Sequence, residues 1–216
     1  MRKIFLTGVA LLSSLLLSAQ QDVKAKGILD QVSEKTSSLK TISADFAFTM
    51  QNKEMDINEK NIGSIKIKGQ KYCVDLSDAG IKVFSDGKTV WNYMKDGNQV
   101  TISDLDDQSN ELMSPSSLFN IYEKDFTSKF IAEKKLGNKV IYQIELFPEN
   151  KEQDVSKVVL SIDKETMMIQ SAVLYETDGN LYGIEVLKME TNREFPDTDF
   201  VFDSSKYKDL EVIDFR

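Results

Sequence analysis

Residues 63–100 decide the fold, and they read GSIKIKGQKYCVDLSDAGIKVFSDGKTVWNYMKDGNQV. Ile65 and Ile67 alternate with serine and lysine, and the alternation continues at Tyr72, Val74 and Leu76. A period of two is typical of strands with one buried and one solvated face. Asp-Gly pairs at 86–87 and 96–97 predict tight hairpin turns. The stretch therefore predicts several consecutive antiparallel strands.

The same alternation extends to both sides of this stretch. Upstream, Phe46, Phe48 and Met50 share one face of a strand over residues 42–50. Further strands are predicted near residues 64–68, 72–76, 81–84, 90–93, 99–103, 126–136, 140–147, 156–162, 168–176 and 180–191. We expect a mainly β (α+β) fold in which about ten or eleven strands form one strongly curved sheet or barrel.

Two helices are expected to accompany the sheet. Apolar residues recur at three- and four-residue spacing over residues 22–39, which predicts an amphipathic helix. A second helix is predicted to begin at Ser114, which can cap it, with Pro115 in the first turn. The pattern leaves two arrangements open. Either the barrel closes and fills with side chains, or the helices form a partial lid over an apolar hollow.

The first nineteen residues have the pattern of a secretory signal peptide. Arg2 and Lys3 precede an apolar run, and Ser18 and Ala19 precede polar sequence. An uncleaved membrane anchor is the alternative. Without residues 1–19, the remaining 20–216 hold 25 basic and 35 acidic residues, and we expect them to form one domain. This acidic balance argues against nucleic acid and anionic membrane surfaces as partners.

The composition also limits the available chemistry. The chain has no histidine and a single cysteine, Cys73. Catalytic triads, Cys-His dyads and imidazole metal sites are therefore excluded, and no intramolecular disulfide is possible. Asp104, Asp106 and Asp107 lack the spacing of a calcium loop, so a solvated acidic loop is expected there. We predict no enzymatic activity, no cofactor and no metal.

The segment SDGKTVW at residues 85–91 resembles the outer-membrane lipoprotein carrier (LolA-type) family, with Tyr93, Gln99 and Val100 in step. Flanking matches are LKTISADFAFTM at 39–50, Ser114-Pro115 with Leu118, DGN at 178–180, and the tail at 200–202 and 212–214. The resemblance implies an incomplete antiparallel β-barrel with a helical lid over a hydrophobic cavity for acyl chains.

The resemblance also implies a cellular role. Members of the family are soluble monomeric periplasmic carriers, which take lipoproteins from an ATP-driven transporter in the inner membrane. They deliver this cargo to the outer membrane, in some cases through a receptor. One departure is visible: Gly69-Gln70 occupies the place of the family's basic-proline step, so the arginine that gates the cavity is absent. Lys68 is adjacent but, by alternation, should point to the other face.

Candidate cavity residues follow from alternation and the resemblance. They are Phe46, Phe48, Met50, Ile65, Ile67, Trp91, Tyr93, Tyr142, Ile144 and Leu146, with Leu118 from the second helix. For each of them ordinary core packing is an equal alternative, and the face on which Trp91 lies is left open. In the shared motif, Ser85, Asp86, Gly87 and Lys88 are expected to form a structural turn rather than a ligand site.

Two other functions are compatible with the sequence. A lipid- or lipopeptide-binding sensor could share the architecture, although such sensors add a second domain. A carboxylate-dependent hydrolase could use pairs drawn from Asp45, Asp86 and Glu185, but no motif supports it. A dry apolar hollow favours the carrier, whereas convergent paired carboxylates favour the enzyme.

Overall fold

The computed structural model describes residues 23–105, 126–150 and 153–216. The expected signal peptide (1–19) and the expected second helix with Leu118 lie outside the described residues. The first described element is the N-terminal helix, which spans residues 23–37. This agrees with the helix expected over residues 22–39.

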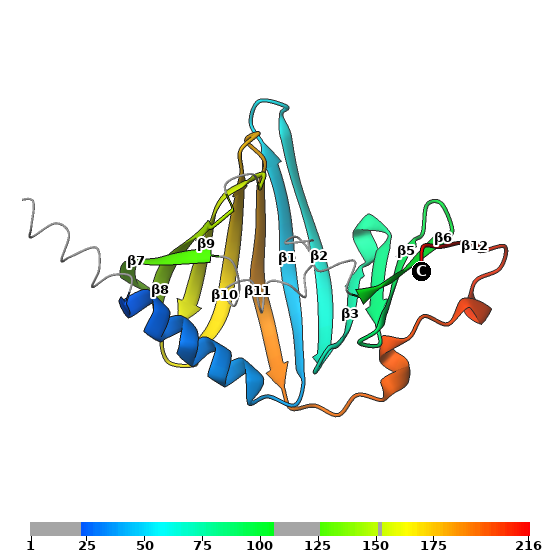
Figure 1. Ribbon diagram of the computed structural model, residues 1–216, viewed down its shortest axis with the longest axis horizontal. Coiled ribbons are helices and arrows are strands. Elements are labelled where there is room, and N and C mark those ends of the chain that lie inside the picture. Colours follow the sequence, from blue (N-terminus) through cyan, green and yellow to red (C-terminus); the bar gives the residue numbers. More distant parts are fainter. Residues whose placement is uncertain (1–22, 106–125, 151–152) are drawn as a thin grey trace, which may run out of the picture.

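In the described part of the chain, twelve strands follow the helix (Figure 1). They are β1 (Ile42–Asn52), β2 (Ile57–Lys68), β3 (Lys71–Leu76), β4 (Ile81–Ser85), β5 (Thr89–Met94), β6 (Gln99–Asp104), β7 (Phe126–Leu136), β8 (Lys139–Pro148), β9 (Val155–Asp163), β10 (Met168–Glu176), β11 (Leu181–Thr191) and β12 (Glu211–Asp214). Short 3-10 turns occur at η1 (Ser77–Ala79), η4 (Asp197–Phe200) and η5 (Ser204–Lys206).

All twelve strands belong to one sheet, in the order β12-β6-β5-β4-β3-β2-β1-β11-β10-β9-β8-β7. Every neighbouring pair is antiparallel except β12 with β6, which is parallel. The sheet is strongly curved (Figure 1). Within the described residues β7 and β12 are its two edges, so it is not closed. The structure confirms a mainly β, incomplete barrel and adds β12 to the expected strands.

The strand register fixes which side chains share a face. Phe46 and Phe48 in β1 lie opposite Gly63 and Asn61 in β2, and opposite Val186 and Ile184 in β11. We call this side of the sheet the inner face, because the N-terminal helix packs on it. Side chains that alternate with them, such as Asp45 and Lys66, lie on the outer face.

The main core lies between the N-terminal helix and the inner face of β7 to β10. The helix contributes Ala25, Ile28, Leu29 and Val32, each at most 6% exposed. They pack against strand residues that include Phe130, Ile144, Leu146, Val158, Leu160, Ile162 and Leu174. Figure 1 shows the helix crossing this half of the sheet. Burial of one apolar side chain stabilises the fold by about 1.5–3 kcal/mol, so this contact anchors the helix.

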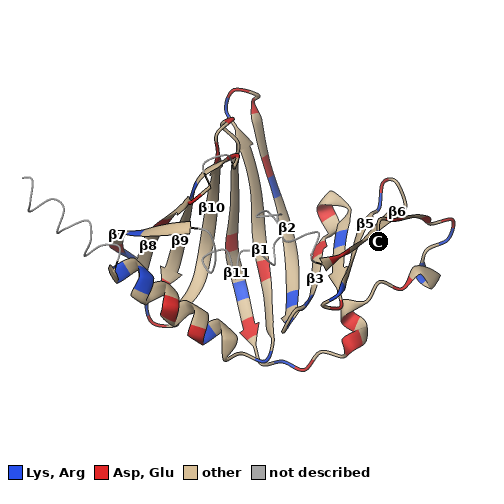
Figure 2. Ribbon diagram, viewed as in Figure 1, with Lys and Arg blue, Asp and Glu red and all other residues tan. Residues whose placement is uncertain are grey.

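The C-terminal strap, residues 193–210, covers part of the outer face. Phe202, Tyr207 and Leu210 pack against Tyr93 and Val100. Acidic residues of η4 meet basic residues of β2 and β3, where Lys66 binds Asp199 and Lys68 and Lys71 both bind Asp197, each at 2.8 Å (Figure 2). The strap then leads to β12, which pairs with β6 and so joins the sheet.

Candidate lipid-binding site

A second apolar cluster occupies the inner face at the centre of the sheet. Its buried members are Ala44, Phe46, Ile65, Tyr72 and Val74, from β1 to β3. Half-buried apolar side chains surround them, namely Phe48, Ile67, Leu76, Val83, Leu105, Ile184, Val186 and Met189. We call this set the inner cluster. Unlike the core beneath the N-terminal helix, it has no described helix packed on it.

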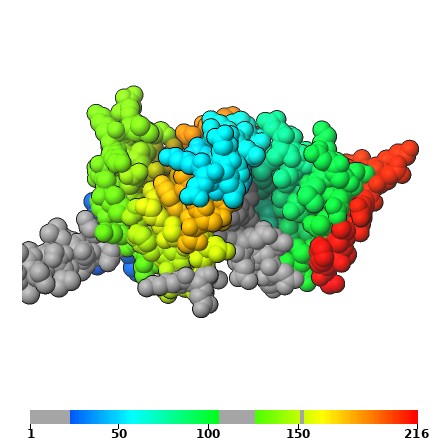
Figure 3. Space-filling view, turned by 90° about the horizontal axis from the view of Figure 1, so that it is seen from above, coloured from blue at the N-terminus to red at the C-terminus, as the bar shows by residue number. Residues whose placement is uncertain are grey.

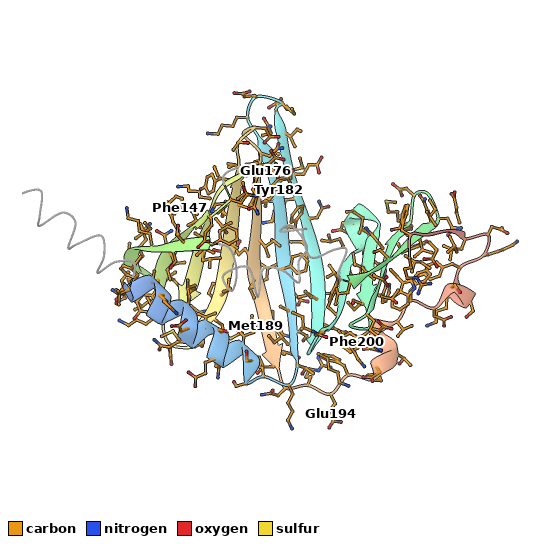
Figure 4. The ribbon with its side chains drawn as sticks, viewed as in Figure 1. Phe147, Glu176, Tyr182, Met189, Glu194 and Phe200 are labelled. Atoms are coloured by element: carbon orange, nitrogen blue, oxygen red, sulfur yellow. The ribbon has the colours of Figure 1, made fainter. Side chains whose placement is uncertain are left out.

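The inner cluster and the helix-covered core are continuous. Phe48 of the inner cluster stacks on Tyr182, which packs against the helix-covered core, with ring centroids 6.3 Å apart. Figure 4 shows Tyr182 and Met189 near opposite ends of β11, the strand between the two regions. Burial and the nearby Glu176 and Asp178 carboxylates raise the pKa of the Tyr182 hydroxyl, so it stays neutral. A continuous apolar region therefore runs across the inner face from β7 to β4.

The structure brings most of the predicted cavity residues to this face. Phe46 and Ile65 are buried within the inner cluster, and Phe48 and Ile67 are half-buried at its surface. Met50 shares the face, since it lies opposite Glu59 and Tyr182. Tyr142, Ile144 and Leu146 also lie on it, but in the part that the N-terminal helix covers. These last three therefore serve core packing.

Trp91 and Tyr93 lie on the outer face instead. Trp91 lies opposite Phe84 of β4. Phe84 follows Val83, whose side chain is on the inner face, so Phe84 and Trp91 both point to the outer face. Tyr93 is 7% exposed, and its ring lies 4.4 Å from Tyr207 and 5.7 Å from Phe202 in the strap. The structure thus separates both residues from Phe46 and Phe48, and we exclude them from the lining. Leu118 lies outside the described residues.

Six half-buried residues of the inner cluster were not among the predicted candidates, and three of them, beside Leu76, Val83 and Leu105, come from one distant strand. These three are Ile184, Val186 and Met189, all in β11. The register places β11 next to β1, although about 140 residues separate them in the chain. The alternation of Tyr182, Ile184 and Val186 in the sequence could have predicted that these side chains share one face of the strand. The pairing with β1 had no local signal.

The SDGK motif forms the turn between β4 and β5. The Asp86 carboxylate accepts hydrogen bonds from the backbone N–H groups of Lys88 and Thr89, both at 2.9 Å. Gly87 has φ +91°, which favours glycine, and its N–H donates to the buried Ser85 hydroxyl at 3.2 Å. The Ser85 hydroxyl and the Asp86 carboxylate thus serve the turn, which is the structural role predicted for the motif.

The departure at Gly69-Gln70 falls on the turn between β2 and β3. Gly69 has φ +59°. Lys68 donates to the Phe195 carbonyl at 3.0 Å and to Asp197 at 2.8 Å, both in the strap. This confirms that Lys68 points to the outer face. The lysines that flank this turn, Lys68 and Lys71, therefore bind the strap on the outer face and do not reach the inner cluster.

Two cavities lie on the outer face, each of about 260 Å³. One is lined by residues that include Cys73, Lys82 and Asp199, and the other by residues that include Asp45 and Glu190. Burial raises the pKa of the Cys73 thiol to about 11, despite the opposing effect of the nearby Lys66. The thiol is therefore protonated at neutral pH. Among the described residues no group of acidic or cysteine side chains could hold a metal ion.

Figure 3, seen from above, places the tip of the β1–β2 hairpin at the centre, with β7 to β10 on one side and β3 to β6 on the other.

No helix in the described ranges is long and apolar enough to cross a membrane.

Comparison with known proteins supports the same reading of the fold. A protein from Pasteurella multocida described as an outer-membrane lipoprotein carrier protein is 26% identical over 98% of each chain. An uncharacterised conserved protein from Thermus thermophilus has a TM-score of 0.59 at 16% identity, covering 88% of this chain and 99% of that one. A solved structure of MucB has a TM-score of 0.50 at 13% identity, covering 84% of this chain and 64% of that one.

The family comparison is more specific. Residues 37–203 match the family described as outer membrane lipoprotein carrier protein LolA. This range contains eleven of the twelve strands and most of the strap. The family is defined by carriage and not by a catalysed reaction, in agreement with the prediction that the chain is not an enzyme. The chain belongs to the LolA family of outer membrane lipoprotein carriers.

Proposed function

We propose that this protein is a periplasmic carrier that binds the acyl chains of lipoproteins at the inner cluster and moves them from the inner to the outer membrane. The observation that carries the proposal is the half-buried apolar surface around Phe48, Ile184 and Met189 in the middle of a curved, unclosed sheet. A soluble domain rarely leaves a contiguous apolar surface in such a position without a ligand or partner for it.

The energetics suit an acyl ligand. Each buried methylene contributes roughly 0.8 kcal/mol, so sheltering a chain of about sixteen carbons is worth on the order of 10 kcal/mol. A non-directional apolar surface suits such chains, because they carry no groups for specific hydrogen bonds. Both membranes can then exchange the cargo with the protein without exposing the chain to water.

The family and the sequence support the remaining parts of the proposal. The signal-like residues 1–19 and the lipoprotein carrier family favour a periplasmic location. The donor would be an ATP-driven transporter of the inner membrane, and the acceptor an outer-membrane receptor or the membrane itself. An acidic surface would keep the carrier from adhering to anionic membranes between the two steps.

The test is release of a lipoprotein from the inner membrane. Spheroplasts that express a labelled outer-membrane lipoprotein are incubated with the purified protein, and the supernatant is analysed for a one-to-one complex. We expect release with the wild-type protein and none with Val186→Glu, which places a charge in the inner cluster. The matched control is Leu187→Glu at the next position, where the side chain is 52% exposed. Equal release by both variants would contradict the proposal.

A further inference from the structure

One row of inner-face side chains changes character where the sheet passes from β4 to β5. The register aligns the row across seven antiparallel strands, from β11 to β6. In order, its members are Met189, Ala44, Ile65, Val74, Val83, Asn92 and Thr101. The first five are apolar and belong to the inner cluster. The last two are polar and uncharged.

Asn92 and Thr101 are therefore neighbours at the end of the inner cluster. They lie directly opposite each other on β5 and β6, and Asn92 lies opposite Val83. Asn92 is exposed and Thr101 is half-buried. No hydrogen bond joins either side chain to another described residue. Their amide and hydroxyl groups are thus available beside an apolar surface.

The neighbouring rows on this face offer the pair no cation. The adjacent rows on the same face contain Tyr72, Ser85, Val90 and Ser103 on one side, and Leu76, Ile81, Met94 and Gln99 on the other. These rows hold no basic side chain from β3 to β6, and where the second row continues into β12 it ends at the acidic Glu211, opposite Gln99. An anionic headgroup would find no counter-ion here, whereas a neutral carbonyl could accept hydrogen bonds from the asparagine amide and the threonine hydroxyl.

We propose that Asn92 and Thr101 form a subsite for the neutral ester or amide group through which an acyl chain is attached to its carrier molecule. The inference rests on the proposed function, since it requires the chain itself to lie on the inner cluster. An ester or amide carbonyl left unpaired beside an apolar surface would lose its hydrogen bonds to water. The pair restores them where the row leaves the inner cluster, between Val83 and the apolar Ile213 of β12. The subsite favours acyl esters and amides over free fatty acids, whose ionised carboxylates need a cation.

The test compares two ligands of equal chain length, a monoacylglycerol and the corresponding fatty acid, by titration of the delipidated protein. The variant is Asn92→Leu combined with Thr101→Val, which keeps the size of both side chains close to the original. The control is Thr127→Val, on the exposed side of β7. Loss of two hydrogen bonds should weaken monoacylglycerol binding on the order of tenfold, with fatty acid binding changed by less than about twofold.

The outcomes are distinguishable. Selective loss of the monoacylglycerol in the double variant, with the control unchanged, supports the subsite. Equal weakening of both ligands, or no change in either, overturns the subsite but does not contradict the proposed function, since the wild-type protein still binds both lipids. Failure of the wild-type protein to bind either lipid contradicts the proposed function as well.

Discussion

Phe46 of β1 lies directly opposite Gly63 of β2, and a Cβ atom added to Gly63 would come within 2.8 Å of the Phe46 ring. It would also lie 2.7 Å from a Leu76 methyl group and 2.9 Å from the Asp75 carbonyl oxygen. Glycine inside a strand marks a place where other groups approach the backbone closely. Here the Phe46 ring and Leu76 fill the space over Gly63, so the glycine allows the inner cluster to pack densely at its base.

Gly63→Ala should therefore destabilise the protein. The Asp75 carbonyl belongs to the backbone of β3 and cannot move without disturbing the sheet. Overpacking of this kind costs about 1–3 kcal/mol, measurable as a lower midpoint of urea unfolding. The matched control is Gly27→Ala in the N-terminal helix, where an added Cβ meets nothing within 4 Å. That variant should gain up to about 1 kcal/mol from helix propensity. A stable Gly63→Ala protein would disprove the packing argument.

The ion pairs of Asp197 predict how the strap responds to acid. Hydrogen bonds and attraction from Lys68 and Lys71 lower the pKa of Asp197 to about 2. Because the pKa is depressed in the folded protein, the pairs contribute fully above the ordinary value of 3.8 and are lost as the pH falls toward about 2. Thermal unfolding midpoints of wild-type protein and Asp197→Asn should therefore differ at pH 5 to 7 and converge near pH 2. A difference that persists near pH 2, or is absent at pH 6 in low salt, would refute this account.

Cys73 offers a reporter for attachment of the strap. The thiol lies on the outer face beside Thr198 and Asp199, and its raised pKa of about 11 keeps it protonated. Reaction with a disulfide reagent at pH 8 should be much slower than in urea-unfolded protein. Asp197→Asn should accelerate it by loosening the strap.

The control for this experiment is Asp214→Asn, which removes another ion-paired carboxylate, bound to Arg216 near the chain end. It should leave the rate of Cys73 modification unchanged. Equal acceleration by both substitutions would show that the reagent reaches Cys73 without movement of η4.

The sequence predicted the strands well because each carries its own alternation and ends at a recognisable turn. The Asp86-Gly87 turn is an example, since its hydrogen bonds are all local. The alternation of Phe46 and Phe48 likewise predicted their common face. Such features need no knowledge of distant segments.

The facing of Trp91 and Tyr93 could not be predicted in this way. Ile81 and Val83 are apolar on the inner face, while Phe84, Trp91 and Tyr93 are apolar on the outer face. Both faces are apolar here because the strap, about 110 residues further along the chain, covers the outer one. β12 escaped prediction for a related reason, since four residues in parallel pairing with β6 leave almost no pattern.

The most direct measurement of the central claim is binding of a fluorescent acyl-chain probe to delipidated protein, compared between Phe48→Glu and Ile62→Glu. Phe48 is half-buried in the inner cluster, whereas Ile62 lies on the outer face of the neighbouring strand and is 45% exposed. Both variants should remain folded by circular dichroism. The account predicts that Phe48→Glu loses probe binding while Ile62→Glu binds like the wild type. Normal binding by a folded Phe48→Glu protein would contradict it.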